Sequence, residues 1–179
     1  MADYSLAPEE QRLVAATLLF ASLKRIRSVD DVHRLFEPFI KQRLPPGEEE
    51  AFVKDRDKLR GWLDTLLAGG RADVAIVTAV RQVLARTGFA RLDFVHGALG
   101  IAHLELPGVE ACYSFAMALL MDRNRKLTPL LRRCAAPGCD RYLLTKRGRG
   151  RPGNWCSERH RDAAERYQNA QRVKRYIDG

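Results

Sequence analysis

The sequence predicts a mostly α-helical fold with a small β-hairpin, of the α+β class, in which a helical N-terminal domain precedes a small C-terminal module. Apolar residues recur at helical spacing through most of the first 125 or so residues. The period changes near residues 89–106, and cysteines and positive charges gather in the last 50 residues. We therefore expect a helical domain over residues 1–127 and a second domain over 128–179.

Breaker residues separate the predicted helices of the first domain. Pro8 suits a first helical turn. Ser28, with Asp31 three residues later, resembles a capping box that opens a second helix. The Pro-Pro-Gly run at 45–47 ends that helix. The predicted helices cover residues from about 8–24, 28–42, 48–68, 72–86 and 109–122.

A β-hairpin is expected near residues 89–106, between the fourth and fifth helices. Residues 89–95 and 101–106 have the pattern of two short strands. His96-Gly97 and Gly100 lie in the connection between them, and Pro107-Gly108 closes the hairpin. The hairpin is the only β-structure predicted for the N-terminal domain.

The composition favours a cytoplasmic protein. No run approaches the roughly 18 apolar residues that a membrane helix needs. The first residues lack the basic and then apolar pattern of a signal segment. Four cysteines in 179 residues argue against a disulfide framework.

The net charge of +9 is concentrated at the C-terminal end. Residues 130–179 hold 13 Lys and Arg against 5 Asp and Glu, whereas residues 1–129 hold 18 against 17. Such asymmetry favours a polyanion-binding end on a neutral body. The alternative is that a basic tail only aids solubility.

Four residues of the basic end have the spacing of a zinc site. Cys134 and Cys139 are separated by four residues that include Pro-Gly, the favoured centre of a type II turn. Cys156 and His160 are four apart at the start of a predicted helix, with Ser157 as its N-cap. Two such local pairs can supply the four tetrahedral ligands that one structural Zn²⁺ requires.

The predicted zinc module is a treble-clef-like finger, with a hairpin over about 142–155 joining the two ligand pairs. Its small size means that metal binding would supply much of its folding free energy. Two alternatives stay open: Cys112 could replace His160 as the fourth ligand, or the cysteines could be free thiols. Cys112 lies on an apolar helix and is expected in the core.

Basic residues around this site are candidate nucleic-acid contacts. Residues 149–152, Arg-Gly-Arg-Pro, resemble the core of an AT-hook, which places arginines in a narrow minor groove. A solvated basic loop that touches phosphates is the alternative. The candidate contacts are Arg141, Lys146, Arg147, Arg149, Arg151, Arg159, Arg161, Arg166, Arg172, Lys174 and Arg175.

The finger resembles the CGNR zinc-finger family. The resemblance rests on residues 132–139, Arg-Arg-Cys-Ala-Ala-Pro-Gly-Cys, on the hydrophobic strand after them, and on Trp155-Cys156-Ser157. In that family a helical domain, called ABATE, precedes the finger. The resemblance implies a bacterial stress-induced transcription regulator whose finger binds DNA.

The chain departs from the family pattern at the fourth ligand. In the family, four residues separate the third ligand from a cysteine that lies within its Cys-Gly-Asn-Arg signature. Here the Gly-Asn-Arg is absent, and the fourth ligand is His160, one residue earlier in spacing. Any base-reading role of the signature therefore does not carry over.

Together these observations favour a zinc-dependent DNA-binding transcription regulator, associated with the nucleoid. The helical domain would sense a small-molecule or protein effector, or form a homodimer. The alternatives are an RNA-binding or ribosome-associated module and a protein-interaction adaptor. No nucleophile or carboxylate has a recognisable catalytic spacing to His33, His96 or His103, so we do not expect an enzyme.

Overall fold

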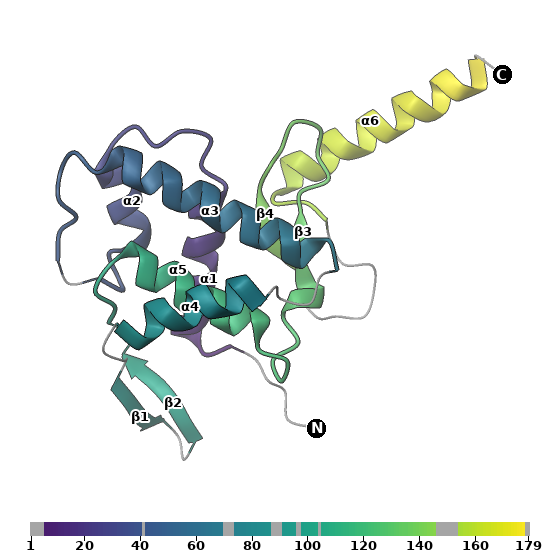
Figure 1. The fold of residues 1–179 in the computed structure, drawn as a ribbon. Coiled ribbons are helices and arrows are strands. Elements are labelled where there is room, and N and C mark those ends of the chain that lie inside the picture. The colour runs from purple at the N-terminus through teal and green to yellow at the C-terminus, as the bar shows by residue number, and fades with distance from the viewer. Residues whose placement is uncertain are drawn as a thin grey trace. The chain divides into compact units, whose positions relative to one another are not determined.

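The chain forms two compact units, residues 1–129 and 130–179, in the computed structural model. The structure describes residues 6–40, 42–69, 74–86, 91–95, 98–103, 105–145 and 154–177. The boundary lies two residues after the one expected from the sequence. The predicted class, mostly α with small antiparallel sheets, is confirmed (Figure 1).

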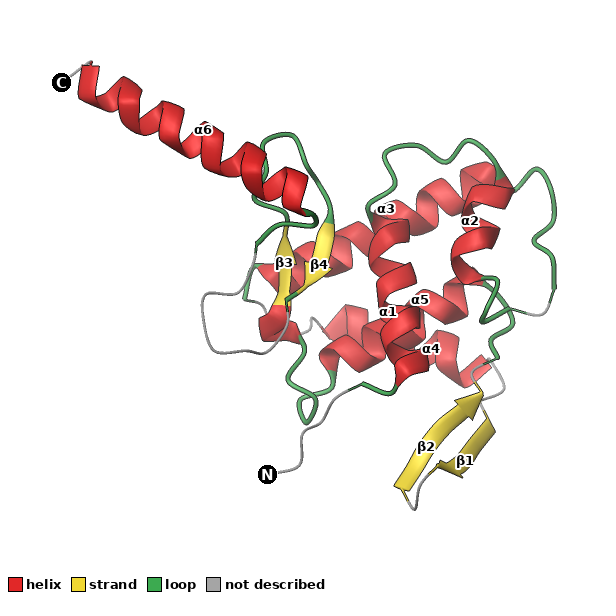
Figure 2. Ribbon diagram, turned by 180° about the vertical axis from the view of Figure 1, so that it is seen from behind, coloured by secondary structure: helices red, strands yellow, loops and turns green. Residues whose placement is uncertain are grey.

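The N-terminal unit consists of five helices and one hairpin among its described residues. Figure 2 shows the hairpin at one end of the group of helices. The elements are α1 (Pro8–Ala21), α2 (Val29–Phe36), α3 (Glu49–Leu67), α4 (Val74–Arg86), β1 (Arg91–Val95), β2 (Ala98–His103) and α5 (Val109–Met121).

Helix α2 is shorter than the sequence predicted. Its N-terminus is as expected, because the Ser28 side chain accepts a hydrogen bond from the Asp31 N–H at 3.3 Å. The helix ends at Phe36 instead of near residue 42, and a turn follows in which the Phe39 N–H donates to the Phe36 carbonyl at 2.8 Å. This turn buries the side chains of both Phe39 and Ile40. A continuing helix would not place both of these side chains in the core.

The strands of the central hairpin also differ in their bounds from the prediction. Strands β1 and β2 are antiparallel, and Val95 pairs with Ala98. The second strand therefore starts at residue 98, not 101, and the connection consists of residues 96 and 97 alone. A register irregularity lies between Arg91 and Leu92.

The core of the N-terminal unit is built around α1 and α5. The Phe20 ring lies edge-on to Phe36, with 5.6 Å between ring centroids, and stacks on Tyr113 at 6.5 Å. Cys112 is fully buried in the same helix as Tyr113, as predicted. Each large apolar side chain buried in this way stabilises the unit by about 1.5–3 kcal/mol. The fully buried set also includes Leu13, Val14, Val32, Leu59, Leu63, Met117 and Leu120.

Two arginines of α3 hold the C-terminal end of α1. Arg60 donates to the carbonyl oxygens of Ala21, at 2.5 Å, and Leu23, at 2.9 Å. Arg56 is only 8% exposed and donates to the carbonyls of Leu23 and Lys24. The last carbonyls of a helix lack partners within it and carry partial negative charge. The Arg60 guanidinium satisfies the Ala21 carbonyl, and both arginines hold the residues that follow the C-cap of α1 against α3.

A buried ion pair fastens the other end of α1. Glu10 is 3% exposed, and its two carboxylate oxygens accept hydrogen bonds from both Nη atoms of Arg125, at 2.5 and 2.9 Å. The same carboxylate accepts from the Ala7 N–H at 2.9 Å. Residues 115 positions apart are thereby joined in a bidentate contact.

Replacing Arg125 with alanine should destabilise the N-terminal unit. The substitution leaves the Glu10 carboxylate buried without its cation, and we expect a loss of about 3 kcal/mol in the free energy of unfolding. The matched control is Arg123→Ala, an exposed arginine two residues away, which should cost less than about 0.5 kcal/mol. Denaturant unfolding followed by circular dichroism measures both; equal losses would contradict the assigned role of the pair.

Candidate metal centre

The first two predicted ligands lie at a tight turn between two short strands of the C-terminal unit. Strand β3 (Leu131–Arg133) pairs antiparallel with β4 (Tyr142–Leu144), after a 3₁₀ turn, η1 (Thr128–Leu130), that crosses the unit boundary. The Cys134 N–H donates to the Arg141 carbonyl at 2.8 Å, which continues the strand pairing to the first ligand.

The turn itself has the predicted type II features. The Cys139 N–H donates to the Ala136 carbonyl at 3.1 Å, and Gly138 has a φ of +71°. Pro137 fixes the preceding φ, and glycine accepts the left-handed conformation without steric cost. This turn brings the sulfurs of Cys134 and Cys139 to the same side.

The other two ligands lie at the start of α6 (Glu158–Ile177). Ser157 is the N-cap, since its hydroxyl and its carbonyl oxygen both accept from the His160 N–H, at 3.3 and 3.1 Å. Cys156 immediately precedes the cap, so the first helical turn points its sulfur and the His160 ring together. The Ala135 N–H donates to the Asn154 carbonyl at 2.7 Å and holds this segment against the knuckle formed by β3, the turn and β4.

The four ligand atoms form one cluster that is able to hold a metal ion. All lie within 4.8 Å of one another. The Cys139 and Cys156 sulfurs are 3.8 Å apart, and His160 Nδ1 is 3.6 Å from the Cys134 sulfur and 2.9 Å from the Cys156 sulfur. Cys112 is absent from the cluster. The ligand set predicted from spacing is therefore the set that the structure brings together, and the Nδ1 atom faces it.

The electrostatics of the cluster disfavour three thiolates in the absence of a cation. Burial raises the pKa of the Cys134 thiol, but hydrogen bonds from the backbone N–H groups of Ala136 and Cys156, and from His160 and Cys139, outweigh it and lower that pKa to about 7. Burial raises the pKa of the Cys156 thiol, and the sulfurs of Cys134 and Cys139 raise it further, to about 11. Without a metal ion the cluster keeps a proton on Cys156 at neutral pH, because adjacent thiolates repel one another.

A small apolar cluster packs behind the ligands. Cys134, Ala136 and Ala164 are its buried members, and Trp155 and Leu143 pack against it. Ala164 is one helical turn beyond His160, so α6 presents this face to the knuckle. Beyond Ala164, every α6 residue whose side chain the structure describes is exposed.

The hairpin expected over residues 142–155 differs from what the structure shows. Strand β4 pairs with β3, which precedes the first ligand, and the described residues 154–155 are not in a strand. Residues 146–153 lie outside the described part. The pairing of β3 with β4 orients Cys134 and Cys139 directly. One hydrogen bond, from the Ala135 N–H to the Asn154 carbonyl, then holds the segment before Cys156 against the knuckle.

The candidate nucleic-acid contacts fall into three groups. Arg141, Arg159, Arg161, Arg166 and Arg172 are exposed. Lys174 and Arg175 lie in α6, but the structure does not describe their side chains. Lys146, Arg147, Arg149 and Arg151, and with them the AT-hook-like run, lie outside the described residues.

One basic residue beside the metal centre was missed from the sequence. Arg133 donates to the Tyr142 hydroxyl at 3.0 Å, and its guanidinium lies 5.2 Å from the centre of that ring. The two residues are directly opposite in the β3–β4 register. The sequence alone does not reveal this contact, because the two residues are nine positions apart and meet only when β3 pairs with β4.

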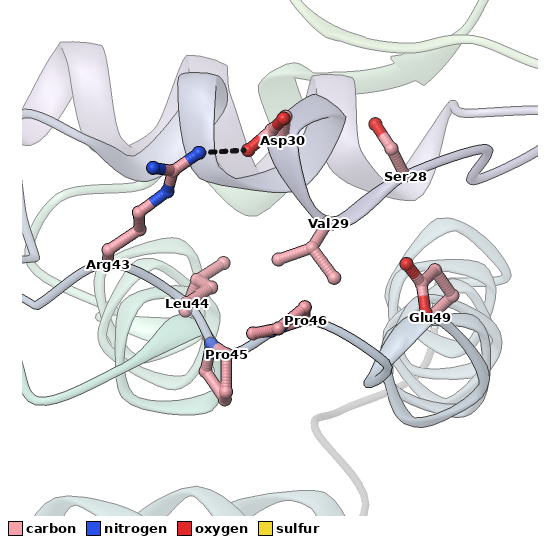
Figure 3. A pocket seen from close by; sticks show the side chains of 8 residues that line it. All are labelled: Ser28, Val29, Asp30, Arg43, Leu44, Pro45, Pro46 and Glu49. Carbon is pink, nitrogen blue, oxygen red and sulfur yellow. Dashed lines mark hydrogen bonds and ion pairs between the residues drawn. The ribbon is translucent and has the colours of Figure 1, made fainter.

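The N-terminal unit carries surface pockets of its own. One of about 470 Å³ lies where the loop over residues 43–46 passes the start of α2 (Figure 3). Its rim holds an exposed ion pair between Arg43 and Asp30 at 3.4 Å. Another, of about 540 Å³, is lined by apolar residues such as Val80 and Met121, with Arg81 and Arg123 also on its wall.

The chain matches no protein-family model and no curated protein. The ligand cluster and the basic helix attached to it are therefore the observations on which a function can be based. In the part of the chain that the structure describes, no helix is both long enough and apolar enough to cross a membrane.

Metal affinity should rise with pH, with a change of slope near pH 7. A bound metal displaces the Cys156 proton throughout the neutral range, but it displaces a Cys134 proton only below about pH 7. The logarithm of the affinity for Zn²⁺, used as the probe, should therefore fall more steeply below pH 7, by at least about one further unit per pH unit. Competition with a chromogenic chelator measures this. Cys112→Ser serves as the control, and an unchanged slope through pH 7 would refute the assignment.

Removing the metal should unfold the C-terminal unit alone. Its apolar cluster is small, whereas residues 1–129 have their own core. We expect chelation to remove the far-ultraviolet helical signal of α6 and to leave the main thermal transition in place. Circular dichroism, with elemental analysis to verify metal loss, tests this expectation. A full helical signal in verified metal-free protein would contradict it.

Proposed function

We propose that the C-terminal unit is a structural zinc module that binds DNA, and that the protein is a transcription regulator. The observation that carries this proposal is a four-ligand Cys/His cluster placed at the start of a long, exposed, basic helix. The resemblance to the CGNR family gives the same function, and the geometry adds separate support.

The donor set and its distances favour zinc. Two sulfurs on one tetrahedral zinc ion, each about 2.3 Å from it, lie about 3.8 Å apart, and a sulfur and an imidazole nitrogen lie about 3.5 Å apart. The 3.8 and 3.6 Å separations in the cluster match these values. The 2.9 Å between Cys156 and His160 is shorter, so zinc would move this pair apart. Three thiolates and one imidazole complete the tetrahedron, which makes the site structural.

The second half of α6 is suited to contact DNA. Residues 166–177 contain four basic residues and no acidic one. The acidic residues of the helix lie in its first two turns, where the helix dipole favours negative charge. Twelve residues of α-helix extend about 18 Å, and the major groove is wide enough to admit a helix.

The exposed arginines of this half lie on two sides of the helix. Arg166 and Arg172 are six positions apart, which places them about 120° apart around the axis. A helix in the major groove faces phosphates on both walls, and such an arrangement allows contact with each. Arg166 and Arg172 form no ion pair with another described residue. Arg161, by contrast, forms ion pairs with Asp162 at 3.5 Å and with Glu165 at 3.9 Å.

In this proposal the N-terminal unit supplies regulation, by binding an effector or partner or by forming a homodimer. Its pocket of about 540 Å³ lies in the size range of small-molecule sites. Its lining is mainly apolar and holds two arginines, Arg81 and Arg123, against one carboxylate, Asp122, which pairs with Arg125; an apolar molecule with an anionic group would suit this wall.

RNA binding is the second candidate, and one observation favours it. Tyr167 and Tyr176 are exposed, at 54% and 90%, and unpaired bases stack on such rings. The two tyrosines are nine positions apart, however, and therefore lie on opposite sides of α6. They cannot form one stacking platform on a single helix, so duplex DNA remains the favoured ligand.

Duplex DNA binding should depend on Arg166 and Arg172. A titration of the full chain at several salt concentrations should give a linear fall of log affinity with log salt. Arg166→Ala/Arg172→Ala should reduce that slope by about two and weaken binding to all sequences. The preferred duplex should still be distinguished at salt concentrations that abolish binding to random competitor.

The matched control is Arg34→Ala/Arg86→Ala, which removes the same charge from exposed positions of the N-terminal unit. We expect no change of slope in this variant. If hairpin RNA or an acidic protein outcompetes duplex DNA at every salt concentration, the proposal of a DNA-binding regulator is wrong.

A further inference from the structure

We infer that the metal centre is also an oxidation switch, in which peroxide joins Cys139 to Cys156 in a disulfide and expels the metal ion. The inference rests on the proposed zinc site and adds a regulatory input at that site. Three features of the cluster carry it: the distance between the two sulfurs, their accessibility, and the different surroundings of Cys134.

The two sulfurs are close enough to join with a small movement. They lie 3.8 Å apart, and a disulfide bond is about 2.05 Å long, so each sulfur has to move by less than about 1 Å. Cys139 lies at the end of the knuckle turn and Cys156 just before the cap of α6. The bond would thus link the two halves of the module at the place where the metal links them.

Accessibility separates these two sulfurs from the third. Cys139 and Cys156 are half-buried, whereas Cys134 is only 6% exposed. The Cys134 sulfur also accepts hydrogen bonds from two backbone N–H groups, those of Ala136 and Cys156. Such bonds withdraw electron density from a metal-bound thiolate and make it a poorer nucleophile than the other metal-bound sulfurs. Peroxide should therefore react at the Cys139 or Cys156 sulfur first.

The chemistry balances with peroxide as the oxidant. One thiolate attacks the peroxide oxygen, the O–O bond breaks, and a sulfenic acid and hydroxide result. The second thiolate attacks the sulfenic sulfur, the S–S bond forms, and a second hydroxide leaves. Two electrons pass from sulfur to oxygen, and two protons from solvent convert the hydroxides to water. Cys134 and His160 remain as the only ligands, too few to complete a zinc site.

The test uses the full chain, loaded with zinc and treated with hydrogen peroxide. We expect about one zinc ion released per chain, detected by a chromogenic chelator, together with a Cys139–Cys156 disulfide mapped by mass spectrometry. Dithiothreitol with added zinc should restore metal content and the helical signal of α6. Cys112→Ser, which removes the buried cysteine outside the cluster, should release zinc at the rate of the unmodified chain.

The outcomes separate this inference from the proposed function. Zinc retained under peroxide, a disulfide that includes Cys134 or Cys112, or loss that thiol cannot reverse would each overturn the switch. Those results would leave the proposed function intact if the reduced protein still binds zinc and DNA. A reduced protein without zinc would instead refute the proposed function, and the switch with it.

Discussion

Repulsion among sulfur ligands is the constraint on which the C-terminal unit depends. Three cysteine sulfurs and an imidazole lie within 4.8 Å of one another, on a surface that buries few apolar side chains. In the absence of a cation, burial and the neighbouring sulfurs hold a proton on Cys156, with a pKa of about 11. A divalent metal replaces that proton and attracts every ligand at once. In the proposed zinc-bound state, coordination would be the main link between the knuckle and α6, and the proposed DNA-binding helix would have a fixed base only while the metal is bound.

The N-terminal unit is stabilised by different means. Its aromatic core is supplemented at both ends of α1 by arginines: Arg125 pairs with the buried Glu10, and Arg56 and Arg60 donate to carbonyls at and just beyond the C-terminal end of the helix. These contacts do not involve the metal ligands. The two units can thus differ in stability, as the proposed regulation would require, because the C-terminal unit could respond to conditions that leave the N-terminal unit folded.

The local features of this chain could be read from sequence, and the long-range ones could not. The Pro-Gly turn at 137–138 and the Ser157 cap are set by neighbouring residues, so spacing alone identified the four residues that the structure brings together in one cluster. The end of α2 depends on the burial of Phe39 and Ile40, which only the assembled core determines. The choice of β3 as the partner of β4 and the contact between Glu10 and Arg125 likewise arise from pairing across the fold.

The exposed length of α6 has a mechanical consequence. The helix is held to the module through its first two turns, and Tyr176 lies 16 positions beyond His160, or about 24 Å along the axis. A tilt of about 10° at the ligands would move that end by about 4 Å, more than the length of a hydrogen bond. With a metal bound at these four residues, a small change in coordination geometry would therefore be enlarged at the far end of α6 into a displacement comparable to one base-pair step.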